Sequence, residues 1–142
     1  MRGWRAGVWP LGVCLLAAWA GCGSGVDPDD LARFAGWYDV TEAFTGDSGV
    51  QCPPPPVEIV ANAVEMRVDG NQFEARFDSR WGDLLGEISE DGSFLSSGNL
   101  GPDQTLRFSG SFTEEVVSGS LDDVRSGCTR TFGVNGTRRP TR

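Results

Sequence analysis

The chain has 142 residues with 12 Arg, no Lys, no His and 20 acidic residues, which give a formal net charge of -8. Without an imidazole, a Ser-His-Asp or Cys-His relay and a His-ligated zinc site are excluded, so acid–base chemistry would rest on carboxylates. The length fits one domain, and the acidic balance disfavours nucleic acid as a partner, because an acidic surface gains nothing from neutralising phosphates.

The N-terminal segment has the plan of a signal peptide. Arg2 and Arg5 precede an uncharged, mostly apolar stretch at residues 6–21. This stretch is interrupted by Pro10 and falls short of the roughly 20 apolar residues that a membrane-spanning helix needs. We therefore expect the segment to be removed from the mature protein.

Small residues and a cysteine follow the apolar stretch. Ala20 and Gly21 directly precede Cys22, which is followed by Gly23. This arrangement resembles the lipobox of bacterial lipoproteins, although that family favours Leu where this chain has Trp19. The resemblance implies that residues 1–21 are cleaved and that Cys22 becomes the lipidated first residue of an exported, membrane-anchored protein. Because the family's inner-membrane retention signal is an Asp where this chain has Gly23, the resemblance also implies the outer membrane.

An ordinary secreted protein, cut after Ala18 or Ala20 and left with a spare thiol at Cys22, is the alternative. In the lipoprotein interpretation, residues 22–33 are the lipidated cysteine with a flexible tether, and residues 34–142 are a single β domain. Cleavage would remove two Arg, leaving 10 Arg against 20 acidic residues and a charge of -10.

Beyond residue 37, apolar and polar residues alternate with a period of two, which is typical of strands. Residues 64–68 and 73–77 are predicted to form a hairpin around Asp69-Gly70-Asn71. Residues 84–89 and 93–96 form a second hairpin, with Ile88 opposite Phe94. Near Asn62 the apolar positions change from odd to even, which indicates a bulge or a break between strands.

Towards the C-terminus, a strand at residues 106–112 pairs with one at 117–121 so that Gly110 faces Gly119. Facing glycines mark a sharply bent or crowded place in a sheet, or alternatively room for a ligand. With a last strand at residues 128–134, the sequence predicts about eight short strands, an all-β antiparallel meander closed into a barrel or folded as a sandwich. Gly36-Trp37-Tyr38 resembles the Gly-x-Trp of lipocalins, which implies a lipocalin-like barrel.

The remaining cysteines, Cys52 and Cys128, are an even pair in a chain predicted to be exported, so we expect a disulfide between them. Cys52 follows the first strand and Cys128 begins the last, so this bond would join the two ends of the sheet.

Other motifs receive structural interpretations. The segment 46–49, Gly-Asp-Ser-Gly, resembles the nucleophile segment of trypsin-like proteases, but no His is present to activate Ser48. Residues 53–56 form a run of four prolines, which stiffens a loop or offers a contact to a protein. The acidic pairs at 114–115 and 122–123 are expected in solvated turns. Trp37 is expected in the core, and Trp81 is expected to be partly exposed.

Together these features predict a lipid-anchored envelope protein that binds or fills a structural role, needs no cofactor and has no metal site. Its ligand would be a small apolar molecule or an envelope protein. A barrel interior could hold such a molecule among Tyr38, Phe73, Phe77, Phe108 and Phe112. A carboxylate-dependent hydrolase of the envelope is the alternative and would need two converging acids in a cleft. A purely structural or assembly role is expected if the interior is packed and an apolar patch is exposed.

Overall fold

The computed structural model describes residues 28–55, 59–78 and 81–141. Residues 1–21 and Cys22, the predicted signal peptide and lipidation site, lie outside the described residues. The described elements are, in order, α1 (Pro28–Leu31), η1 (Ala32–Phe34), β1 (Gly36–Gly49), β2 (Val60–Asp69), β3 (Gln72–Phe77), β4 (Asp83–Ile88), β5 (Ser93–Gly101), β6 (Gln104–Thr113), β7 (Val116–Arg125) and β8 (Cys128–Arg138).

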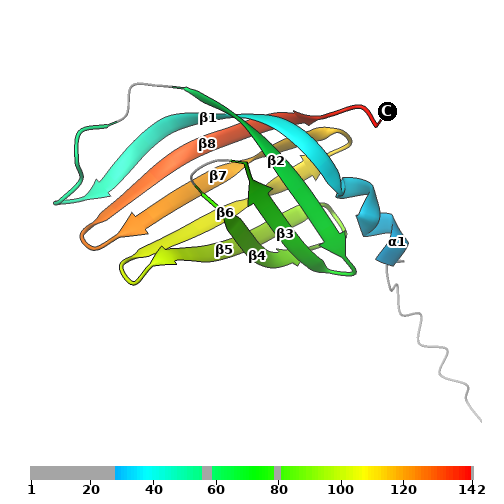
Figure 1. Cartoon of the computed structure of the whole chain (residues 1–142), viewed down its shortest axis with the longest axis horizontal. Helices are drawn as coiled ribbons and strands as arrows, with labels where there is room; N and C mark the ends of the chain where they lie inside the picture. Colours follow the sequence, from blue (N-terminus) through cyan, green and yellow to red (C-terminus); the bar gives the residue numbers. More distant parts are fainter. Residues whose placement is uncertain (1–27, 56–58, 79–80, 142) are drawn as a thin grey trace, which may run out of the picture.

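The eight strands form one closed barrel in chain order, each antiparallel to the next (Figure 1). The barrel closes where β8 pairs with β1, in a register that runs from Tyr38↔Arg138 to Gly49↔Cys128. The all-β prediction is confirmed, and of the two predicted architectures the barrel is the one observed.

The barrel has two different ends. At one end α1 and η1 lie beside the β2–β3, β4–β5 and β6–β7 turns, and Figure 1 shows α1 and the C-terminus at this same end. We call this the helix end. At the other end lie the end of β1, the loop that leads to β2, and the start of β8, which carries Cys128. We call this the disulfide end.

Both predicted hairpins have the expected register. In the first, Val64 pairs with Phe77, Met66 with Ala75 and Val68 with Phe73, and Gly70 in the turn has a φ of 59°. In the second, Ile88 pairs with Phe94. Because alternation places every second side chain on one face, these pairs point apolar side chains into the barrel.

The change of phase near Asn62 is the start of a strand. The β1–β2 register is continuous from Glu42↔Val60 to Gly36↔Met66, without a bulge. Ile59 precedes the strand and is exposed, while Val57 lies outside the described residues. Asn62 itself occupies an inward position in phase with Val64, so β2 keeps a single phase from its first residue.

The helix end is closed by Leu31, which the sequence assigned to the tether, and by Phe34, the first residue of the predicted β domain. Pro28–Leu31 and Ala32–Phe34 form helical turns instead of an extended segment, because Leu31 and Phe34 bury their side chains against the core. The Phe34 ring stacks on Phe112 at a centroid distance of 5.1 Å. Within the described ranges, no helix is long and apolar enough to cross a membrane.

The two tryptophans of the described chain have the opposite exposures to those predicted, since Trp37 is on the surface and Trp81 is buried. Trp37 is 42% exposed and Trp81 is 3% exposed, so both predictions were wrong. Trp37 alternates with the inward Tyr38 and therefore points outward from β1. Trp81 lies in the β3–β4 loop, where no strand periodicity applies, and it folds inward over the disulfide end against Phe132.

Gly110 and Gly119 face each other across β6 and β7, as predicted. A Cβ built on Gly110 would lie 2.3 Å from the Ser118 carbonyl oxygen and 2.7 Å from the Gly119 Cα. The pair therefore marks a close approach of two backbones, and it leaves no room for a ligand at this point.

We expect Gly110→Ala to lower the free energy of unfolding by about 1–3 kcal/mol, because the strands must separate to admit the methyl group. Urea denaturation followed by circular dichroism measures this change. Gly101→Ala is the matched control, since a Cβ there meets no atom within 4 Å, and it should change stability by less than about 0.5 kcal/mol. Equal stability of the two variants would contradict the crowding.

Candidate functional site

The five aromatic residues predicted to line a ligand site, Tyr38, Phe73, Phe77, Phe108 and Phe112, all lie buried in the core. A sixth ring, that of Phe94, lies among them, with centroids 4.7 Å from Phe73, 4.8 Å from Phe108 and 5.1 Å from Phe112. These are ordinary contact distances for packed rings. A ligand inside this cluster would have to displace the contacts between the rings, so ligand binding by these residues stays a prediction.

Tyr38 also ties the cluster to the helix end. Its hydroxyl group donates a hydrogen bond to the Phe34 carbonyl oxygen at 3.1 Å. Burial raises the pKa of the Tyr38 phenol, so the group remains a donor. Outside this closure lies a pocket of about 460 Å³, lined by Arg33, Phe34, Asp91, Phe112, Glu114, Glu115 and Arg138.

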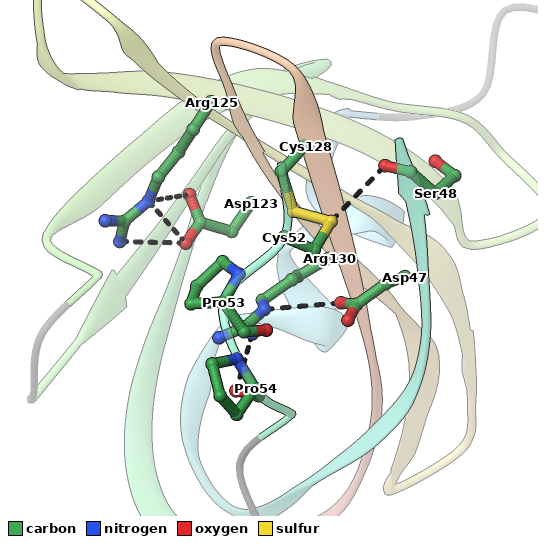
Figure 2. The surroundings of a disulfide bond; sticks show 9 residues. All are labelled: Asp47, Ser48, Cys52, Pro53, Pro54, Asp123, Arg125, Cys128 and Arg130. Atoms are coloured by element: carbon green, nitrogen blue, oxygen red, sulfur yellow. Dashed lines mark hydrogen bonds and ion pairs between the residues drawn. A yellow bond between two sulfur atoms is a disulfide. The ribbon is translucent and has the colours of Figure 1, made fainter. Parts of the chain in front are cut away.

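At the disulfide end, the predicted bond between Cys52 and Cys128 is present, with an S–S distance of 2.03 Å (Figure 2). Cys128 is paired with Gly49 at the last position of the β1–β8 register. The Gln51 backbone N–H donates to the Gly127 carbonyl oxygen at 3.3 Å. The disulfide therefore holds the start of the β1–β2 loop against the β7–β8 turn.

Arg130 fixes the proline segment that follows. Its guanidinium donates to Asp47 at 3.2 Å, to the Pro53 carbonyl oxygen, and to the Pro54 carbonyl oxygen at 2.7 Å (Figure 2). A run of prolines has no backbone N–H to donate to a sheet ladder, and here the carbonyl oxygens of Pro53 and Pro54 accept from a side chain instead. Pro53 and Pro54 are thus attached to β8 as well as to Cys52, whereas Pro56 lies outside the described residues.

We call the bonds from Arg130 to Asp47, Pro53 and Pro54 the Arg130 clamp. Beside it the disulfide end has a pocket of about 240 Å³, lined by Trp81, Leu100, Gln104, Asp123, Arg125, Arg130 and Phe132. Asp123 is buried at its edge and accepts bonds from Arg125 at 3.0 Å and from Gln104 at 2.8 Å. The sequence placed Asp122 and Asp123 in a turn, which was wrong. Both lie in β7, with Asp123 directed inward and Asp122 accepting a bond from Thr131.

Deeper in the barrel, Glu42 is a carboxylate with 1% exposure. One of its oxygens accepts a bond from Trp81 Nε1 and the other from Asn62 Nδ2, both at 2.7 Å. A buried charge needs such donors, because it loses its hydration on folding. This network holds Trp81 in its inward position and explains why two polar residues occupy inward positions of β1 and β2.

The disulfide excludes a thiolate metal site at this end. Asp47, Cys52 and Cys128 bring potential ligand atoms within 4.8 Å of one another, but the two sulfurs are bonded together and offer no thiolate to a metal. Ser48, the serine of the protease-like segment, lies near the end of β1, and its carbonyl oxygen is 3.6 Å from Cys52 Sγ.

Several of these residues carried only a weak signal in the sequence. Glu42 continues the inward series of Tyr38 and Val40 along β1, so its burial follows once the strand is extended beyond Val40. Phe94 is opposite Ile88 as predicted, and its place among the other rings follows from the same inward face. Arg130 is inward by the same alternation in β8.

Comparison with protein-family models, curated proteins and solved structures finds no match to this chain.

We expect Trp81→Phe to lower the free energy of unfolding by about 1–3 kcal/mol, because an aromatic side chain is kept while the indole N–H that donates to the buried Glu42 carboxylate is lost. Thermal and urea denaturation measure the change. Trp37→Phe is the control, because Trp37 lies on the surface, and it should shift stability by less than about 0.5 kcal/mol. Equal stability of the two variants would show that the Trp81–Glu42 hydrogen bond does not contribute to the free energy of unfolding.

Replacing Cys52 and Cys128 together with Ser should destabilise the protein by about 4.5 kcal/mol, since the bond closes a loop between residues 76 positions apart. Equilibrium urea unfolding gives this value. The wild-type protein unfolded in the presence of a thiol reductant should match the double variant. A double variant with the wild-type unfolding midpoint would argue against this contribution.

Proposed function

We propose that this chain is an exported lipoprotein of the cell envelope, anchored through Cys22, whose barrel has a structural or assembly role and no catalytic activity. The observation that carries the proposal is the packing of the interior. The ring of Phe94 lies among the five predicted ligand residues, Phe34 closes the helix end and Trp81 closes the disulfide end. A filled barrel favours contacts through its outer surface.

The disulfide supports the exported location, because such bonds form and persist in oxidising compartments and are rare in the cytosol. The lipid anchor rests on the lipobox resemblance at residues 20–23. A diacylglyceryl group with a further acyl chain would give a stable anchor, whereas a single chain binds a bilayer only marginally.

The position of α1 gives the anchored barrel an orientation. The chain enters the barrel at Pro28, on the helix end, and β1 carries it over roughly 40 Å of strand to the disulfide end. An anchor at Cys22 would therefore hold the helix end towards the membrane. The proline segment, the disulfide and the pocket beside Trp81 would then face away from it.

A carboxylate-dependent hydrolase is the second candidate, and the two buried carboxylates of the described residues, Glu42 and Asp123, are what favour it. Each of them already accepts bonds from two side chains of the fold itself. This arrangement supports structural roles for both, so we place the non-catalytic module first.

Metabolic labelling with a fatty acid tests the anchor. We expect the wild-type protein and Cys14→Ala to incorporate the label and Cys22→Ala to lose it, because Cys14 would leave with the signal peptide. Label on Cys22→Ala equal to that on the wild type would exclude the anchor.

Solvent extraction of the same purified protein tests the packed interior. Mass spectrometry should find acyl chains that stay covalently bound to Cys22 and no apolar molecule released from the barrel. One released molecule per chain would instead identify a ligand-binding barrel and contradict the structural role.

A further inference from the structure

Two exposed leucines lie together on the outer wall of the barrel. Leu85 on β4 is 63% exposed and Leu95 on β5 is 61% exposed. The register pairs Leu85 with Ser97 and Glu87 with Leu95, so the leucines are diagonal neighbours, about 7–8 Å apart. Single exposed leucines are common, but two that adjoin on neighbouring strands form a continuous apolar surface.

A hollow of about 320 Å³ lies beside Leu85. Its lining is mixed, with Arg67, Asp69, Gln72 and Glu74 as well as Val68 and Phe73. The exposed apolar part of this face is therefore the leucine pair itself.

Charges of opposite sign flank the two leucines. Glu87 lies next to Leu95 on β4, and Arg107 lies on β6, paired with Ser97. Both are exposed, and within the described part of the chain neither makes an ion pair or a side-chain hydrogen bond. By contrast, Arg67, Arg76, Arg125, Arg130 and Arg139 each pair with an acidic side chain.

We propose that this face, made of Leu85, Leu95, Glu87 and Arg107, is the contact between two copies of this chain. A two-fold axis that lies in the plane of the sheet and runs through both leucines sets each leucine against its own counterpart. The same axis carries Arg107 of one copy across to Glu87 of the other, because these residues lie on opposite sides of the leucine pair. The face is therefore complementary to itself in both apolar surface and charge.

We expect the contact to be small, because two convex barrel walls would bury less than the roughly 800 Å² per partner of a standard interface. A weak dimer in dilute solution follows. The inference rests on the proposed function in one respect, because an anchor at Cys22 would confine both copies to one membrane and raise their effective concentration.

Oxidative cross-linking of the full chain in cell membranes tests the contact. We expect Leu95→Cys to form a covalent homodimer on a non-reducing gel, since this position would face its own copy at the axis. Val116→Cys, an exposed apolar position on β7, is the matched control and should remain monomeric. Cross-linking of both variants to the same extent, or of Leu95→Cys to a different protein, would overturn the proposal.

A charge exchange in the Leu95→Cys background tests the pairing. Arg107→Glu should reduce the dimer about tenfold, and adding Glu87→Arg should restore it, because the pair is then re-formed with opposite polarity. Circular dichroism confirms that these surface variants fold. Loss without restoration, or no loss, would exclude the proposed axis.

Different results would refute the proposed dimer and the proposed lipid anchor. If labelling excludes lipid at Cys22, the same charge exchange is measured on the secreted protein by sedimentation equilibrium at high concentration. The pattern of loss and restoration is still expected there. A protein that is labelled at Cys22 but monomeric in every variant would retain the anchor and exclude the dimer.

Discussion

From Tyr38 to Gly49, β1 lies against β8, and this pairing converts a meander into a closed barrel. Closure gives every strand one face that must fill a narrow interior, and it removes the sheet edges that would otherwise invite association. The seam is held at both ends. The disulfide joins its far end, and near its start the Arg139 backbone N–H donates to the Trp37 carbonyl oxygen at 2.7 Å while the Arg139 guanidinium pairs with Asp39 at 2.6 Å. That bond from Arg139 lowers the pKa of the Asp39 carboxyl group, because it favours the charged form.

The same strand explains the character of the disulfide end. β1 pairs with β2 only as far as Glu42, yet it continues along β8 to Gly49, so its last residues have a strand neighbour on one side among the described residues. Such an edge is protected here by the register shift between Phe44 and Gly46, by the charge of Asp47 and by the prolines that follow. The Arg130 clamp uses this extension, since Asp47 and the proline carbonyl oxygens meet on its inner side. The disulfide and the Arg130 contacts therefore lie at the end of the barrel where β1 has only one strand neighbour among the described residues.

Alternation predicted the parts of the fold in which each strand keeps a simple pattern. The hairpin registers and the opposition of Gly110 and Gly119 followed from it, because a period of two determines the face of every residue in a strand. The disulfide followed instead from the even pair of cysteines in a chain expected to be exported. Alternation failed where a residue lies outside a strand, as with Trp81, or where a polar residue points inward, as with Asn62. The partner of each is Glu42, a contact over 39 and 20 positions of sequence that no local pattern contains. The closure of the helix end by Phe34 was not predicted for the same reason, since the stacking of Phe34 on Phe112 depends on the closed barrel.

A packed interior moves the question of function to the surface. Phe34 and Trp81 cover the two ends, and the rings between them pack against one another and stabilise the barrel. What remains accessible is divided among the clamped proline segment, the pocket beside Trp81 and the wall of β4 and β5. Of these, only the wall combines exposed apolar side chains with charges that have no partner within the described chain. Because closure pairs the strands and the free edge at the end of β1 is protected, the proposed contact between two copies would use side chains on the outer faces, and Leu85 and Leu95 are the largest apolar pair that adjoining strands of the described chain expose there.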